Sequence, residues 1–161
     1  MMRYNLRNLK MYVTIEQELD YIEKYLSIQK IRFGSRIQYE VFCDETLKTF
    51  SIPFFSLQPL VENSIEHGIL QKVEGGSISV ICKKKENAVT IKVEDNGIGI
   101  TEEMLANIKE KLKRKERETV VEHIGIYNCY HRLKLFFEEK MQFHIHSEAG
   151  KGTSVEIVIH T

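Results

Sequence analysis

The first apolar pattern along the chain is a helical stripe. Apolar residues recur at spacings of four, three and four, at Ile15, Leu19, Ile22 and Leu26. Such spacing places them on one face of an α-helix. Thr14 and Gln17 have capping-box spacing just before the stripe, and Gly34 is a suitable end. We therefore predict a helix that ends near residue 34, with its apolar face packed either on its own domain or on a partner helix.

Further along the chain, alternation of apolar and polar residues predicts strands. These strands are expected over 37–43, 78–82, 89–93, 143–145 and 155–159. Turns at 85–87 and 149–152 join neighbouring strands into hairpins. Helical spacing predicts helices from residue 53 or 56 to 68, from 101 to about 112, and over 126–137. Adjacent hairpins without regular βαβ alternation indicate an α+β fold, a two-layer α/β sandwich with helices on one face of the sheet.

Composition narrows the class of protein. The 161 residues fit one domain, and 23 Lys and Arg residues balance 23 Asp and Glu residues, so no basic excess points to a nucleic-acid partner. No apolar run approaches the roughly 20 residues that span a bilayer. The three cysteines form no CxxC pair and indicate buried thiols of a reducing compartment. We expect a cytosolic domain, or a cytosolic piece of a larger protein.

The segment LQPLVENSIEHGI, residues 57–69, is the first with candidate chemistry. Asn63 and His67 are four apart and share one helix face, and Glu62 and Glu66 lie beside them. An amide oxygen, a carboxylate and an imidazole together suit a hydrated Mg²⁺ ion and phosphates. The same pattern also fits the polar, solvent-facing side of an amphipathic helix.

The segment VEDNGIGI, residues 93–100, follows a predicted strand directly. Asp95 stands at the strand end, and Gly97 and Gly99 permit close backbone approaches. A carboxylate in such a turn is suited to accept a hydrogen bond from an exocyclic amine, such as that of adenine. A simple turn is the other interpretation.

Two later segments offer donors for phosphate. Gly125 opens a predicted helix, where backbone amides and the positive end of the dipole favour anions. Asn128 and Lys151 add possible donors, although residues 150–153 also fit a plain hairpin turn. The chain contains no GxxxxGK[ST] motif and no GxGxxG after its first strand, which argues against a P-loop or a Rossmann site.

Taken in order, these segments resemble the ATP-binding domain of the histidine-kinase, gyrase, chaperone and MutL superfamily, the Bergerat fold. More narrowly, the chain is similar to the catalytic part of LytS/YesM-type sensor histidine kinases. LQPLVENSIEHGI matches the N box, VEDNGIGI the G1 box, IGIYNCYHRL the G2 region and GKGTSVEIVI the closing glycine motif. The resemblance implies a mixed, mostly antiparallel sheet. It also implies a helical leader over 1–34, the tail of the dimerisation and phosphoacceptor region, and an ATP-binding catalytic domain over 35–161.

The resemblance assigns roles to the N-box residues. Asn63 would hold Mg²⁺ that bridges the ATP phosphates, and His67 would contact phosphate from the next helical turn. Glu62 would accept the proton of the attacking imidazole. Pro59 stands where gyrase-like ATPases carry a water-activating Glu, which argues against a hydrolytic mechanism.

The remaining motifs imply the rest of the nucleotide site. Asp95 would bind the adenine amine, Gly97 and Gly99 would shape the adenine wall, and Thr153 would support Asp95. Residues 109–124 would form a mobile lid over ATP, anchored by 125–128. Gly125, Asn128, Lys151 and Gly152 would complete the contacts with the nucleotide. His123 stands where the G2 box usually begins with a glycine.

The implied activity is transfer of the ATP γ-phosphoryl group to a histidine, and from there to a response regulator. The acceptor is expected in an NPHFLYN-like context, which none of the six histidines has, namely His67, His123, His131, His144, His146 and His160. The chain is therefore expected to be the cytoplasmic catalytic part of a membrane-bound, homodimeric receptor. Two alternatives stay open: a serine/threonine kinase of the anti-sigma type, and a non-catalytic module that binds partners. A metal site at His144, His146 and His160 is a further geometric possibility.

Overall fold

The computed structural model describes residues 12–114 and 123–161. The elements in chain order are β1 (Tyr12–Thr14), α1 (Ile15–Phe33), β2 (Ile37–Cys43), β3 (Ser51–Pro53), α2 (Gln58–Asn63), β4 (Gly76–Lys85), β5 (Ala88–Asp95), α3 (Glu102–Arg114), α4 (Ile124–Phe137), β6 (Met141–Glu148) and β7 (Gly152–His160). A π-helical turn, Ser64–Gly68, continues α2. Among the described residues, no helix is long and apolar enough to cross a membrane.

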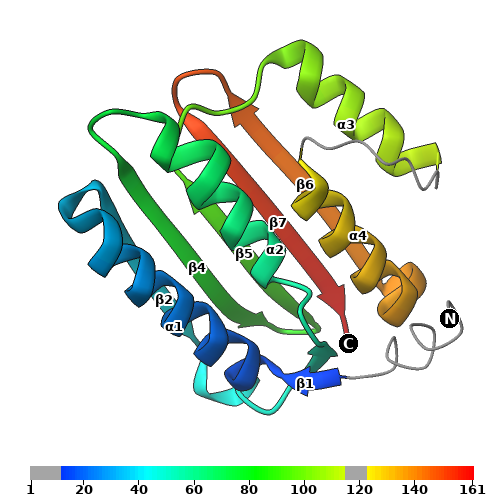
Figure 1. The fold of residues 1–161 in the computed structure, drawn as a ribbon. Helices are drawn as coiled ribbons and strands as arrows, with labels where there is room; N and C mark the ends of the chain where they lie inside the picture. Colours follow the sequence, from blue (N-terminus) through cyan, green and yellow to red (C-terminus); the bar gives the residue numbers. More distant parts are fainter. Residues whose placement is uncertain (1–11, 115–122) are drawn as a thin grey trace, which may run out of the picture.

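The main sheet has the strand order β2–β4–β5–β7–β6. β2 and β4 are parallel, and the other neighbouring pairs are antiparallel. Helices α1, α2 and α4 cover one face of this sheet, and α3 lies beside β6 (Figure 1). The structure therefore confirms the predicted α+β class and the mixed, mostly antiparallel sheet with its helical layer.

The core lies between the helices and the sheet. Buried apolar residues recur at every second position of the central strands, and most of the alternate positions hold polar residues. The α1 stripe joins the same core, because Ile15, Ile22 and Leu26 have no exposed surface and Leu19 has 6%. The apolar face of α1 thus packs on its own fold, and the boundary at residue 34 between a leader and a catalytic domain stays a prediction.

Local signals define the ends of α1 and the start of α3. The amide of Gln17 donates to Thr14 Oγ1 at 3.2 Å, and the amide of Thr14 donates to Gln17 Oε1 at 3.0 Å. This is the predicted capping box, and Gly34 caps the other end with φ 61°. The amide of Met104 donates to Thr101 Oγ1 at 3.3 Å, as expected for a helix that begins after residue 101.

The start of the second helix differs from one of the two predicted positions. A helix from Pro53 is wrong, because residues 51–53 form β3 and pair antiparallel with β1 in a small second sheet. Strands of three residues are too short to show alternation, so the apolar pattern did not reveal them. The regular α-helix begins at Gln58, and its last turn up to Gly68 widens to the π form.

Candidate functional site

One small pocket brings together residues from four separate segments of the chain. Its lining residues are Asn63, Ser64, His67, Gly68, Asp95, Gly99, Ile100, His123 and Thr153. The free volume among them is about 10 Å³, room for about one water molecule. Five residues singled out from the sequence for nucleotide and metal binding therefore meet at one place, namely Asn63, His67, Asp95, Gly99 and Thr153.

Asp95, the last residue of β5, is 6% exposed and lines the pocket. The amide of Gly97 donates to its Oδ1 at 2.9 Å. Burial raises the pKa of the Asp95 carboxyl above its usual value. Hydrogen bonds from the Ser64 side chain and from the backbone amides of Gly97 and Thr153 oppose that rise in pKa. Thr153 thus contacts Asp95 through its backbone amide.

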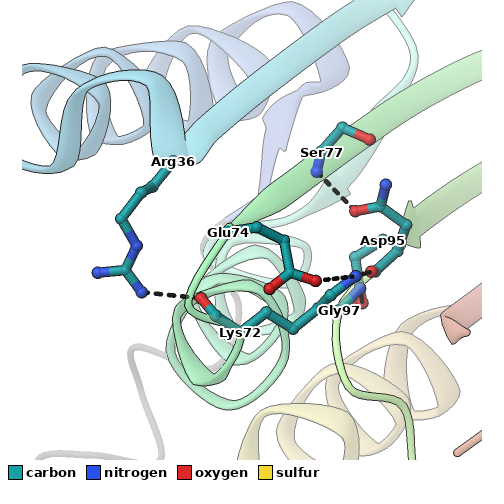
Figure 2. Close-up of polar contacts among 7 residues, drawn as sticks. Arg36, Lys72, Glu74, Ser77, Asp95 and Gly97 are labelled. Carbon is teal, nitrogen blue, oxygen red and sulfur yellow. Dashed lines mark hydrogen bonds and ion pairs between the residues drawn. The ribbon is translucent and has the colours of Figure 1, made fainter. Parts of the chain in front are cut away.

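The turn that follows Asp95 is held from two neighbouring segments (Figure 2). Asn96 Oδ1 accepts a hydrogen bond of 2.7 Å from the amide of Ser77 at the start of β4. Lys72 Nζ donates to the carbonyl oxygen of Asn96 at 3.0 Å, and Arg36 donates in turn to the carbonyl of Lys72 at 2.9 Å. These contacts fix the backbone on which the Asp95 carboxylate is carried.

Gly97 permits the loop after β5 to touch the end of the π-helical turn. A Cβ atom on Gly97 would lie 2.3 Å from the carbonyl carbon of Gly68, a distance that no side chain tolerates. The amide of Ile98 also donates to the carbonyl oxygen of Gly68 at 3.2 Å. Gly97 therefore permits the close contact with Gly68. It does not line the pocket itself.

Asn63 and His67 lie on the same side of their helix, as their spacing predicted. Asn63 ends α2, and His67 belongs to the π-helical turn, a rare form that is frequent at functional sites. The imidazole rings of His67 and His123 have centroids 6.3 Å apart. His123 thus stands at the pocket, immediately before α4, with φ 60° in the left-handed region.

Two serines that the sequence did not single out hold the pocket residues in place: Ser64 lines the pocket, and Ser147 lies beside it in contact with Ile100 and Thr153. Ser64 contributes a hydrogen bond to Asp95. Ser147 Oγ accepts from the amide of Ile100 at 2.8 Å, donates to the carbonyl oxygen of Gly152 at 2.9 Å and lies 2.8 Å from Thr153 Oγ1. Ser147 thereby ties the loop after β5 to the β6–β7 hairpin. Ser64 lies inside the segment 57–69 but had no role assigned to it, and Ser147 lies outside the four motifs.

The other predicted site residues lie around this pocket and do not line it. The Glu62 carboxylate accepts a hydrogen bond of 3.3 Å from Gln58 Nε2. Gly125 packs α4 against α2, since a Cβ there would lie 2.3 Å from the carbonyl oxygen of Pro59. Asn128 is exposed on α4.

The closing glycine motif forms part of the β6–β7 hairpin, and the predicted lid is described only in part. Lys151 is exposed and pairs with Glu148 at 2.8 Å on the hairpin turn. Gly152, with φ 119°, packs its Cα against the backbone of Asp95. Of the predicted lid over 109–124, residues 109–114 complete α3, and 115–122 lie outside the described residues. The described residues contain no group of three or more His, Cys, Asp or Glu side chains that could hold a metal ion.

Two family models match the chain. Residues 55–161 match the family of histidine kinase-, DNA gyrase B- and HSP90-like ATPases, and residues 1–37 match a histidine kinase model. The first match covers all the residues that line the pocket and all the predicted nucleotide-binding residues.

Curated relatives include sensor kinases of several bacteria. The chain is 33% identical to the sensor protein LytS of Bacillus anthracis over 158 residues, which are 98% of this chain and 26% of LytS. It is 33% identical to the sensor histidine kinase YesM of Bacillus subtilis over 159 residues, 99% of this chain and 26% of YesM. The chain therefore spans about a quarter of the length of these two relatives.

Solved structures share the fold at low identity. The catalytic domain of histidine kinase ThkA superposes with a TM-score of 0.62 at 13% identity, over 93% of this chain and 94% of that chain. ShkA in complex with AMPPNP gives a TM-score of 0.63 at 19% identity, over 92% of this chain and 30% of that one. The family model covers residues 55–161, most of the chain, and therefore shows that the chain belongs to the family of histidine kinase-, DNA gyrase B- and HSP90-like ATPases.

Proposed function

We propose that the chain is the ATP-binding catalytic domain of a two-component sensor histidine kinase. It transfers the γ-phosphoryl group of ATP to a histidine outside this sequence, and the phosphoryl group then passes to a response regulator. The curated relatives named LytS and YesM support this proposal, as does the histidine kinase model that matches residues 1–37.

The buried carboxylate of Asp95 is the observation that carries the proposal. Fixed hydrogen bonds hold this carboxylate at the pocket, and burial strengthens its interaction with any donor that enters. The exocyclic amine of adenine is such a donor, and guanine presents a carbonyl oxygen at the same position. Asp95 therefore selects ATP over GTP, with Gly97 and Gly99 supporting the wall beside it.

Asn63 and His67 provide the polar groups for Mg²⁺ and phosphate. An amide oxygen is a suitable Mg²⁺ ligand, and this ion usually combines one or two protein oxygens with water and substrate phosphates. The pocket fits that requirement, because Asn63 brings a single oxygen ligand and no competing thiolate lines it. Bound there, Mg²⁺ would neutralise phosphate charge during transfer. His67 binds a phosphate oxygen, and Lys151, Asn128, Gly125 and Gly152 complete the contacts with ATP.

Glu62 accepts the proton from the attacking imidazole in this proposal. It lies one residue before Asn63, so the proton acceptor and the metal ligand share one turn of α2. The parent protein is a homodimeric, membrane-bound receptor whose dimerisation helices present the acceptor histidine, with residues 1–34 as their continuation. Pro59, near the start of α2, provides no base to activate water.

Removal of Asn63 tests this function directly. Asn63→Ala should abolish Mg·ATP-dependent labelling of an added segment that carries the acceptor histidine, while the far-UV circular dichroism stays that of the wild type. Acid-labile phosphate identifies phosphohistidine, whereas acid-stable phosphate would identify the serine/threonine kinase alternative. Undiminished transfer by Asn63→Ala contradicts the proposal. A calorimetric titration without Mg·ATP binding by the wild type would identify a non-catalytic module.

A further inference from the structure

The first turn of α2 has no capping side chain of its own. Leu57 occupies the cap position and makes no side-chain hydrogen bond there. The amides of Leu60 and Val61 donate to the carbonyl oxygen of Leu57 at 3.0 and 3.3 Å, and Pro59 has no amide hydrogen. The amides of Leu57 and Gln58 therefore need an acceptor from another part of the chain.

Glu18, in the first turn of α1, supplies that acceptor. Its Oε1 accepts hydrogen bonds from the amides of Leu57 at 2.9 Å and Gln58 at 3.2 Å, and its Oε2 accepts from the amide of Phe55 at 2.9 Å. Glu18 is 1% exposed. A buried carboxylate is costly unless it is hydrogen-bonded, and the positive end of a helix dipole favours a negative charge. The charge of Glu18 thus anchors the start of α2 to α1.

The turn just before α2 is strained and is held from both sides. Phe55 has φ 58°, a left-handed conformation that is unfavourable for a bulky residue. The amide of Phe55 donates to Glu18, and Arg132 of α4 donates to the carbonyl oxygen of Phe54 at 3.0 Å. Such a conformation persists only where its surroundings determine it. The position of α2 therefore depends on the buried carboxylate of Glu18.

Gln58 connects Glu18 with a residue one turn further along α2, Glu62. Its backbone amide donates to Glu18, and its side-chain Nε2 donates to Glu62 Oε1 at 3.3 Å. Gln58 is 6% exposed, so neighbouring atoms restrict the rotation of its side chain. A single residue thus connects the anchor in α1 with the carboxylate that precedes Asn63.

We propose that Glu18 and Gln58 are positioning residues, which hold the Glu62 carboxylate in place for phosphoryl transfer. This inference rests on the proposed role of Glu62 as proton acceptor. Glu18 places the backbone at the start of α2, and the Gln58 amide orients the carboxylate one turn later. Neither residue lines the pocket with Asn63 and His67. Loss of the Gln58 amide should therefore lower the rate of transfer and leave the affinity for Mg·ATP unchanged.

Gln58→Met is the sharpest test, because it keeps the length of the side chain and the backbone hydrogen bond to Glu18. We expect transfer at saturating Mg·ATP to slow about tenfold, the effect of one lost hydrogen bond of about 1.4 kcal/mol. The calorimetric dissociation constant for Mg·ATP should not change. The control is Gln71→Met, which removes an exposed amide from the same helical region and should transfer at the wild-type rate.

A double variant separates positioning from a general loss of structure. If Gln58 acts through Glu62, Gln58→Met combined with Glu62→Gln should transfer no more slowly than Glu62→Gln alone. If the two substitutions lower the transfer rate additively, or if Gln58→Met transfers at the wild-type rate, the positioning role is wrong. Neither result contradicts the proposed kinase function. A wild-type chain that transfers nothing overturns both.

Glu18→Gln tests the anchor itself. The neutral side chain should speed hydrogen exchange at the amides of Phe55, Leu57 and Gln58. It should also slow transfer at a temperature where the variant is fully folded. Leu26→Val, a buried change in the same helix, provides a comparison that lowers stability without touching α2's first turn. If Glu18→Gln and Leu26→Val slow transfer by the same amount for the same loss of stability, Glu18 has no specific role in positioning α2.

Discussion

Gly68 and Asp95 are in direct contact: a Cβ atom on Gly68 would lie 3.0 Å from Asp95 Oδ1. The carboxylate has little freedom to withdraw, because the amide of Gly97 donates to the same oxygen at 2.9 Å. Gly68, which the sequence marked only as the end of a helix, is therefore part of the pocket. The absence of a side chain at this position allows Asp95 to keep its place.

Gly68→Ala should weaken ATP binding about tenfold, equivalent to about 1.4 kcal/mol. The added methyl group would displace the Asp95 carboxylate from the line of the adenine amine. The backbone itself tolerates alanine, because φ at Gly68 is −104°. Isothermal titration calorimetry measures the change. Gln71→Ala, three residues further along, is the control and should bind ATP normally, whereas normal binding by Gly68→Ala would contradict the contact.

Asp95→Asn should weaken ATP binding roughly 10- to 100-fold, because the adenine amine loses a charged acceptor. The preference for ATP over GTP should fall in a competition assay. The same substitution should raise the thermal midpoint at pH 7. Since burial raises the pKa of Asp95, its ionised form costs stability above that pKa, and the neutral amide avoids this cost. Equal competition by ATP and GTP in the wild type would exclude Asp95 as the adenine-binding group.

The raised pKa of Asp95 also predicts how nucleotide binding depends on pH. The ionised carboxylate is a stronger acceptor for the adenine amine than the protonated carboxyl group, whose carbonyl oxygen is uncharged. Binding should therefore be strongest above the pKa of Asp95, and it should weaken as the pH falls through that pKa. The loss should begin at a higher pH than an ordinary aspartate would give. Titration with an adenine nucleotide at several pH values measures it, and Asp95→Asn should lack this step.

Ser147→Ala should lower the free energy of unfolding by about 1–3 kcal/mol. The amide of Ile100 would lose its acceptor, and the carbonyl oxygen of Gly152 would lose its donor. Urea denaturation gives the change. Ser79→Ala, on the opposite face of the sheet, is the matched control and should alter stability by less than about 0.5 kcal/mol. Equal effects of the two substitutions would show that Ser147 does not tie the hairpin to the loop.

Patterns that act over a few residues predicted much of the fold. The capping box of Thr14 and Gln17 involves atoms three residues apart, and the β4–β5 hairpin pairs neighbouring strands, so nearby residues determine both. The helices from 101 and over 126–137 follow from apolar spacing in the same way. Local patterns do not predict which strands pair when they are distant in the sequence. The parallel pairing of β2 with β4 is an example.

Long-range contacts of polar residues escaped prediction for a related reason. Glu18 occupies a helix with many charged residues, so its sequence context is that of a surface residue. Its buried position depends on amides 37 to 40 residues away, at the start of α2. Only the folded chain brings these groups together.

Some residues at the pocket were predicted from the sequence and others were not. Asn63, His67 and Asp95 stand in motifs with a recognisable spacing, and the structure brings all three to one place. Ser64 stands in the same motif as Asn63, and Ser147 lies outside the motifs, but neither was assigned a role, because a single serine is compatible with many environments. Glu62, Asn128 and Lys151 lie outside the pocket lining, and their roles toward ATP stay predictions.

The composition of the pocket has a consequence for the stability of the chain. Its lining residues come from four separate segments, which only the folded chain brings together. A molecule that contacts all four segments binds the folded chain and not the unfolded one. Its binding raises the free energy of unfolding by RT ln(1 + [L]/Kd). The temperature at which the chain unfolds would therefore rise with the concentration of the bound nucleotide.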